Sequence, residues 1–204
     1  KNFKDWCDWY TQQNNPLFIP EAWNTAPSAA NFLFAFGNYN TIGTAPFAID
    51  DLKPDDDSAI EKLYLAMKYL GPEILKHQGR EGTMTGFLLN DSQRSVDVQM
   101  GDYNVVIELY SRRGRIVVDD AFGLVIKTGE KEFLVAGSRA LISFKSLVSP
   151  KEKYGIGTVQ EIVHTNGQWK SGRRLNGDET HRGRAVKLPM EEIGIQRVTV
   201  YHYR

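Results

Sequence analysis

The sequence predicts a mixed fold, in which an α/β part at residues 1–80 is followed by an antiparallel, jelly-roll-like β-sandwich at residues 81–204. In the first part, short and wholly apolar runs alternate with helical patterns, which is typical of parallel βαβ units. In the second part, apolar residues recur with period two between frequent turn dipeptides, which is typical of antiparallel sandwiches. A composition of 41% apolar and 25% charged residues excludes a disordered tail, a fibre and a coiled-coil rod.

An apolar stripe predicts a helix at the start of the chain. Its spacing of i, i+3, i+4 and i+7 is that of one helix face. Its members are Phe3, Trp6, Cys7 and Tyr10. Because Cys7 lies in this stripe, we expect a buried thiol rather than a reactive one. It is the single cysteine of the chain, so no intrachain disulfide is predicted.

Two buried strands and a buried helix are predicted next. Leu17–Pro20 and Thr41–Ile49 are apolar runs of strand length, and Pro46 should end or distort the second strand. Ala29–Phe36, between them, is apolar nearly all round and predicts a helix covered on every side. Strands that are apolar on both faces need neighbours, and two strands do not make a stable sheet. We therefore expect a broad apolar surface that another segment or partner covers, and self-association of the chain alone.

A third helix is predicted to begin at Ser58, which forms a capping box with Glu61. Pro72 should start a further turn. Asp55–Asp57 precede this helix, and we expect them to favour its positive N-terminal end. Neither they nor Asp50-Asp51 have the ligand spacing of an EF-hand, so no calcium site is predicted. The apolar stripe of this helix consists of Ile60, Leu63, Tyr64 and Met67.

Period-two stripes predict the strands of the second part, and from about residue 83 onward we expect mostly strand and no helix longer than three turns. The dipeptide Asn176-Gly177 suits the positive φ angles of a type I′ turn, so we expect a hairpin there. Asn166-Gly167 is another turn signal. The stripes are Val96, Val98 and Met100; Tyr103, Val105, Ile107 and Leu109; and Val198 and Val200.

Glu21 is the candidate catalytic residue, because this carboxylate directly follows a predicted buried strand. In α/β barrels the active site is built from the C-terminal ends of the strands and the loops after them. Trp23 and Asn24 come next, and a tryptophan ring can serve as a platform for a sugar. From this pattern alone, a solvated loop residue or a helix-dipole partner remains the more common reading of such a glutamate.

Two segments resemble a known family of hydrolases. The sequence NPLFIPEAW and the following AFGNYNTIGTAPFAIDDL resemble the seventh and eighth strands of a clan-A glycoside hydrolase barrel, and are most similar to bacterial β-galactosidase-like enzymes of glycoside hydrolase family 35. The segments NGQWKSGRRLNGDETHRGRAVKL and IQRVTVYHYR resemble the β-domain appended to these barrels. The resemblance implies the last two βα units of a (β/α)₈ TIM barrel, and a periplasmic or extracellular location.

The resemblance also implies roles for single residues. The glutamate that ends the seventh strand is the catalytic nucleophile of the family, so Glu21 takes that role. From their positions after the strands, rather than from the resemblance, we expect Trp23 to stack on a sugar and Asn24 to bind a hydroxyl group. Phe47 and Asp50, at the end of the eighth strand, would also contact the substrate. The family has PFGID where this chain has PFAID, so Ala48 stands in place of a glycine.

The second catalytic carboxylate of the family is absent from this sequence. Retaining glycosidases need two carboxyl groups about 5–5.5 Å apart. The family's acid/base glutamate follows an asparagine, and no Asn-Glu pair occurs here. The chain therefore resembles the C-terminal portion of a β-galactosidase acting on terminal β-galactosides. The implied partners are a carbohydrate substrate and the missing N-terminal barrel segment of the same protein, and we expect this portion alone to be inactive.

A non-catalytic carbohydrate-binding or structural module is the alternative, with Trp169, Tyr201 and Tyr203 as candidate contacts, provided that their rings are exposed.

Several other classes of protein lose support from the sequence. The formal net charge is zero, which argues against nucleic-acid binding. No run of 18 or more apolar residues predicts a membrane helix. The four histidines lack metal-ligand spacing, and Gly155-Ile156-Gly157 lacks a third glycine, so neither a metal nor a cofactor is predicted.

Overall fold

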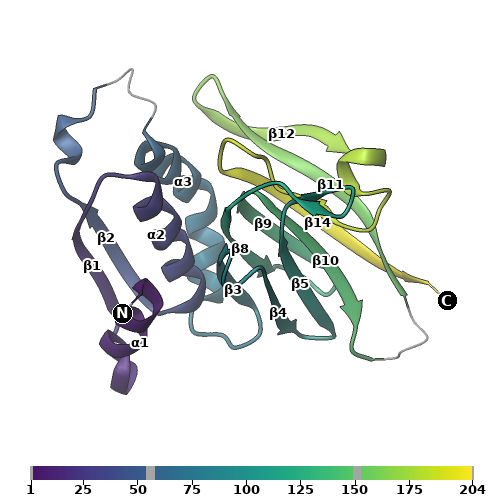
Figure 1. Cartoon of the computed structure of the whole chain (residues 1–204), viewed down its shortest axis with the longest axis horizontal. Coiled ribbons are helices and arrows are strands. Elements are labelled where there is room, and N and C mark those ends of the chain that lie inside the picture. Colours follow the sequence, from purple (N-terminus) through teal and green to yellow (C-terminus); the bar gives the residue numbers. More distant parts are fainter. Residues whose placement is uncertain (1, 54–57, 149–152, 204) are drawn as a thin grey trace.

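The chain folds as an α/β unit joined to a β-domain, which confirms the predicted order of helices and strands (Figure 1). The computed structural model describes residues 2–53, 58–148 and 153–203. Asp55–Asp57, for which a helix-capping role is expected, lie outside these residues. None of the described helices is long and apolar enough to cross a membrane.

The α/β unit holds a small parallel sheet. Strand β1 pairs with strand β2 from Leu17 opposite Thr41 to Ala22 opposite Pro46, and β2 ends at this proline, as expected. The described residues form this two-stranded sheet and no closed barrel. The elements are α1 (Phe3–Tyr10), η1 (Gln12–Asn14), β1 (Leu17–Ala22), α2 (Ala26–Asn38), β2 (Thr41–Pro46), η2 (Ile49–Asp51) and α3 (Ala59–His77).

Helix α1 begins with a capping box between Asn2 and Asp5 that the sequence reading did not identify. Of the predicted stripe, Cys7 is buried, whereas Trp6 and Tyr10 are exposed. Phe3 and Cys7 pack against β1 and α2, whereas the rest of the stripe has little to pack against, because α1 lies at the edge of the unit (Figure 1). Burial raises the pKa of the Cys7 thiol to about 11, so the thiol stays protonated at neutral pH. This confirms the prediction of a core cysteine.

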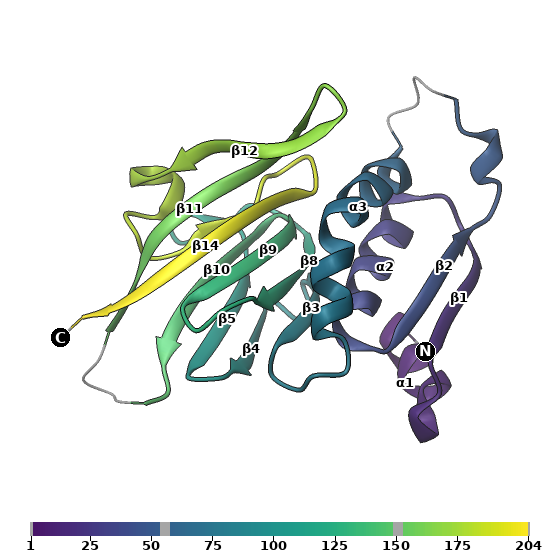
Figure 2. The same ribbon diagram turned by 180° about the vertical axis from the view of Figure 1, so that it is seen from behind.

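Helices α2 and α3 form a layer between the two-stranded sheet and the β-domain (Figure 2). Phe32 and Leu33 of α2 have no exposed surface, as predicted for a helix covered on every side. Two glycines allow α2 to approach the first β-domain strand closely, since a Cβ on Gly37 would lie 2.5 Å from the backbone nitrogen of Gly86. The Asn38 side chain fastens this contact by donating to the carbonyl of Gly86 at 2.9 Å.

Helix α3 begins at the predicted N-cap, where the Ser58 hydroxyl accepts from the backbone of Glu61 at 3.4 Å. The prediction that Pro72 starts a new turn is wrong, because α3 runs through it to His77. Pro72 removes one donor from the helix, and the carbonyl of Lys68 loses its partner. Both residues lie on the solvent side, where water can bind this carbonyl.

The β-domain consists of two antiparallel sheets. One has the strand order β13-β10-β5-β4 and the other β12-β11-β14-β9-β8-β3, with a separate short hairpin of β6 and β7. The strands are β3 (Met84–Asn90), β4 (Ser95–Met100), β5 (Tyr103–Leu109), β6 (Ser111–Arg112), β7 (Arg115–Ile116), β8 (Asp120–Lys127), β9 (Glu132–Ser138), β10 (Ala140–Ser146), β11 (Lys153–Thr165), β12 (Gln168–Leu175), β13 (Val186–Lys187) and β14 (Gly194–Tyr203). Among the described residues of this domain, the longest helix is η3 (Gly177–Thr180), which agrees with the prediction of mostly strand.

The two sheets share one hydrophobic core, in which the Phe133 ring meets Tyr103 at 5.2 Å and Phe144 at 4.7 Å between centroids. The outer face of the six-stranded sheet is also apolar. Leu124 and Leu134 on that face pack in the same cluster as α2 and α3. Strands β8 and β9 are therefore buried on both faces, which explains why they read as continuous apolar runs.

The predicted hairpin at Asn176-Gly177 is wrong. Asn176 has an extended backbone, with φ −155°, and it caps η3 through a capping box with Glu179. The reciprocal bonds to Glu179 favour this helical turn over a type I′ turn. The hairpin forms instead at Asn166-Gly167, where both residues have positive φ and join β11 to β12.

Candidate functional site

Glu21 lies near the C-terminal end of β1, beside the end of the parallel strand β2, as the sequence predicts. Its side chain is exposed. Its backbone adopts a positive φ of 51°, a conformation that is uncommon for a residue other than glycine. Such backbone strain persists where the surroundings enforce it and often marks functional positions.

Trp23 and Phe47 form an aromatic pair next to Glu21. Their ring centroids are 6.0 Å apart and the ring planes are inclined by 70°. The two loops are tied together because the backbone N–H of Phe47 donates to the carbonyl of Ala22 at 2.7 Å. Both rings are exposed, Trp23 by 73% and Phe47 by 54%. Large exposed rings beside a carboxylate are suited to contact the apolar face of a ligand.

The backbone of Ala48, which stands where the resembling family has a glycine, is strained. It adopts a left-handed conformation, with φ 53° and ψ 38°, in which a glycine would carry no steric cost. The substitution therefore leaves the turn intact but strains it. Asp50 follows in η2 and is exposed, and Asn24 is half-buried in the loop after β1. Glu21, Trp23, Asn24, Phe47 and Asp50 thus come from two neighbouring strand ends.

The aromatic residues of the alternative module lie in different surroundings. Trp169 is half-buried between Tyr69 of α3 and His164 of β11, at centroid distances of 5.3 and 5.1 Å. Tyr201 and Tyr203, by contrast, are about half exposed on β14, with ring centroids 5.7 Å apart. Only the tyrosine pair therefore has the exposed faces that a flat sugar-binding platform requires.

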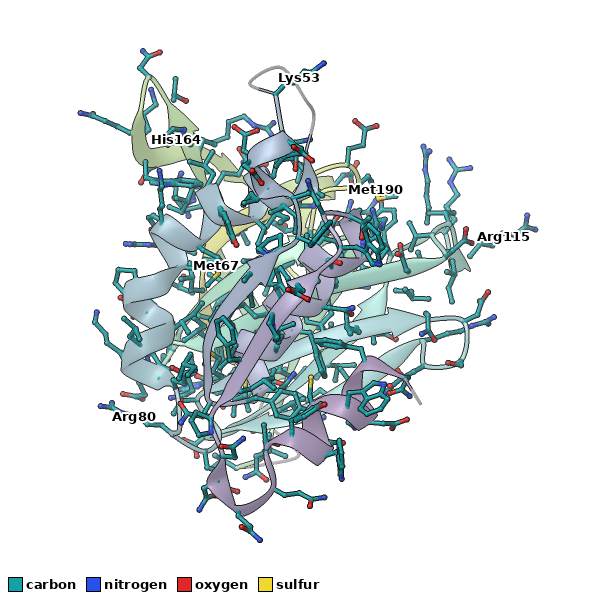
Figure 3. All side chains as sticks on the ribbon, turned by 90° about the vertical axis from the view of Figure 1, so that its left-hand side faces the viewer. Lys53, Met67, Arg80, Arg115, His164 and Met190 are labelled. Atoms are coloured by element: carbon teal, nitrogen blue, oxygen red, sulfur yellow. The ribbon has the colours of Figure 1, made fainter. Side chains whose placement is uncertain are left out.

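Two cavities between the helix layer and the β-domain were not predicted from the sequence. Their volumes are about 770 and 460 Å³. Lys62, Glu192 and Ile193 line both, so the cavities are adjacent, and we call them together the helix–sheet groove. Figure 3 shows Lys53, after η2, and His164, on the β11–β12 hairpin, toward the same end of the molecule, whereas Arg80 lies at the opposite end.

An ion-pair network lies on the wall of the groove. The Arg173 guanidinium contacts Glu161 at 3.0 Å and Glu179 at 3.1 Å. Hydrogen bonds to Glu161, followed by the charges of both carboxylates, raise the pKa of Arg173 above its ordinary value. Within the described ranges, no group of three or more metal-ligating side chains is present.

The molecule is therefore a two-part protein. A parallel α/β unit presents an exposed carboxylate, and an antiparallel β-domain follows it. A family profile described as a domain of unknown function, DUF5597, matches residues 60–187. Since the match covers more than half of the sequence, the chain belongs to the DUF5597 family. No curated protein matches the chain.

Proposed function

We propose that this chain is the C-terminal portion of a retaining glycoside hydrolase, a β-galactosidase that acts on terminal β-galactosides. The observation that carries the proposal is the position of Glu21 at the C-terminal ends of two parallel strands, beside the Trp23–Phe47 ring pair. Barrel enzymes place their catalytic residues at this end of their strands. The resemblance of the sequence to glycoside hydrolase family 35 supports the same role.

In the proposed reaction, the Glu21 carboxylate attacks the anomeric carbon of the galactoside. The bond from this carbon to the leaving oxygen breaks, and a second carboxyl group protonates that oxygen. The resulting glycosyl ester on Glu21 is then hydrolysed by a water that the second carboxylate deprotonates. The chain lacks the Asn-Glu pair of the family, so we assign this second group to the N-terminal barrel segment of the same protein.

The open face of the two-stranded sheet supports a barrel origin for β1 and β2. Phe18 is 51% exposed and Ile42 is 66% exposed, although each belongs to a strand. Each large apolar side chain left in water forfeits about 1.5–3 kcal/mol of burial free energy. In the proposal, β1 and β2 are the seventh and eighth strands of the barrel, and the β-domain is its jelly-roll-like accessory domain.

The test of the proposal is the substitution Glu21→Gln in the intact protein. Glutamine keeps the shape of the side chain but is no anionic nucleophile, so turnover of an aryl β-galactoside should fall by at least about a thousandfold. Glu81→Gln, an exposed carboxylate between α3 and β3, is the matched control and should leave the rate unchanged. A near-normal rate in Glu21→Gln contradicts the nucleophile assignment.

Rescue by azide identifies the role of Glu21 more sharply. In Glu21→Ala, azide can enter from the face that the carboxylate occupied, form the carbon–nitrogen bond and release the aryl oxide. The product should be the α-galactosyl azide. Formation of the β-galactosyl azide would instead assign Glu21 to the acid/base role, because the azide would then have attacked a glycosyl-enzyme formed by another nucleophile.

A non-catalytic carbohydrate-binding module is a second candidate, favoured by the exposed Tyr201–Tyr203 pair. If this candidate is correct, Tyr201→Ala and Tyr203→Ala should each weaken binding of the intact protein to insoluble polysaccharide, by about 5–100-fold for the loss of one stacking or hydrophobic contact. The substitution Glu21→Gln should not affect that binding.

A further inference from the structure

The helix–sheet groove has the size of a ligand site. Its two cavities, of about 770 and 460 Å³, each fall within the range of about 300–1,000 Å³ found for ligand pockets. Pro27 and Asn31, from the first turns of α2, line one end. Trp169 and His164 of the β11–β12 hairpin line the other. The groove lies between the helix layer and the β-domain, where ligand sites are common.

The charges of the groove are largely paired within the protein. Arg173 is held by two carboxylates, and Arg139 contacts Asp120 at 2.8 Å. A surface built to bind a polyanion would leave an excess of unpaired cations, which this wall does not offer. Its balance of charges therefore favours a neutral, polar ligand.

The lining of the groove includes hydrogen-bond acceptors that a bound ligand could satisfy. Gln196 is 4% exposed, and its amide nitrogen donates to the carbonyl of Lys187 at 2.9 Å. Its oxygen has no hydrogen-bond partner among the described residues. The carboxylate of Glu192 is a further acceptor on the lining, and that of Asp178 lies 3.9 Å from Arg182. A ligand rich in hydroxyl groups supplies such donors.

The groove also offers apolar surface next to these acceptors. Leu65 of α3 and Ile193 line it, and the half-buried Trp169 ring is fixed by its neighbours Tyr69 and His164. A rigid aromatic ring contributes apolar contact at low cost in conformational entropy. Carbon–hydrogen faces combined with hydroxyl groups are the chemistry of a saccharide.

We propose that the helix–sheet groove is a binding site for a neutral saccharide. The site is formed by α3, the segment 188–194 and the β11–β12 hairpin, and it is separate from the residues around Glu21. The inference does not depend on hydrolysis by Glu21, since it concerns binding alone.

Calorimetric titration of the full chain carrying Glu21→Gln tests the inference, with lactose and methyl β-glucoside as the probes. The substitution Glu192→Trp fills the junction of the two cavities and should raise the dissociation constant at least about tenfold, which is about 1.4 kcal/mol. Trp169→Phe keeps an aromatic ring but removes contact area, and should raise it by a smaller factor. Glu132→Ala, exposed on β9 of the same sheet and outside the groove, is the matched control and should leave the affinity unchanged.

Each result decides the matter once circular dichroism confirms that the variants are folded. Weaker binding in both groove variants, with unchanged binding in Glu132→Ala, supports the site. Equal affinity in all variants, loss of binding in Glu132→Ala alone, or no saccharide binding at all would overturn it. Because the background already carries Glu21→Gln, failure of the groove proposal is distinguishable from failure of the hydrolase proposal.

Discussion

The β1–β2 sheet and the central strands β8 and β9 of the six-stranded sheet have the same kind of sequence but lie in different surroundings. All four strands carry apolar residues on both faces. Strands β8 and β9 are covered by the four-stranded sheet on one side and by α2 and α3 on the other. The sheet of β1 and β2 has the helices on one side only, and Phe18 and Ile42 remain exposed. Strands with the same kind of sequence are thus buried on both faces in one part of the molecule and on one face in the other.

The prediction with the largest expected effect on stability compares substitutions of two phenylalanines, one in each region. Phe133→Ala removes a ring that is 1% exposed between the two sheets and should lower the free energy of unfolding by about 3–5 kcal/mol. Phe18→Ala removes a ring that is 51% exposed and should change it by less than about 0.5 kcal/mol. Urea denaturation followed by circular dichroism measures both values. Equal losses would show that the open sheet is covered in solution.

The exposed face of the β1–β2 sheet also leads to a prediction about self-association. If the open face drives self-association of the chain alone, the double substitution Phe18→Ser with Ile42→Ser should reduce the apparent mass in sedimentation experiments. Leu75→Ser, an exposed apolar residue of α3 that is 76% exposed, is the matched control and should leave the mass unchanged. A chain that is monomeric before any substitution would contradict the expectation that this surface needs cover.

The second test concerns the close contact between the two parts. A Cβ on Gly86 would lie 2.4 Å from the carbonyl oxygen of Phe34 in α2, so Gly86→Ala should push α2 from β3 and cost about 1–3 kcal/mol. Gly71→Ala in α3 is the matched control. It meets nothing within 4 Å and replaces a helical glycine, so it should stabilise the protein by about 0.5–1 kcal/mol. Thermal denaturation should therefore give shifts of opposite sign, and a loss of stability in both variants would contradict this account.

The sequence predicted the parts of the fold that depend on local pattern. The positions of the helices, the buried α2 and the core Cys7 follow from apolar spacing along the chain, and the position of Glu21 follows from the apolar run before it. The exposure of Trp6 and Tyr10 does not follow from their stripe. The predicted hairpin at Asn176-Gly177 does not form, because two bonds to Glu179 compete with the intrinsic preference of the dipeptide. The groove could not be predicted, since Lys62 and Ile193 come to line the same cavities only through tertiary packing and show no shared period.

A third and smaller test uses pH at the junction of the two parts. His77 ends α3, and burial lowers its pKa, with Glu73 opposing and Arg80, Lys76 and Lys127 adding to the shift. The unfolded chain therefore binds a proton that the folded chain does not, and stability should fall as the pH drops through the ordinary histidine value of about 6.5. His77→Gln should flatten this fall without abolishing it, because burial also lowers the pKa of His181. His202→Gln is the control, and melting temperatures between pH 8 and 5 that respond equally in both variants would contradict the assignment.

The smallest test concerns the strained turn beside the candidate site. Ala48 holds a left-handed backbone with φ 53° between Phe47 and η2, a conformation that costs an L-residue about 1–2 kcal/mol relative to its preferred regions. Glycine adopts it without this cost but loses more entropy on folding, so Ala48→Gly should stabilise the chain by a net amount of about 0.5–1 kcal/mol. The control is Ala45→Gly in the preceding strand β2, which has no such strain and should be destabilised. If Ala48→Gly also destabilises the chain, the turn is not strained, and the PFAID sequence would then have to favour a different loop geometry next to Glu21.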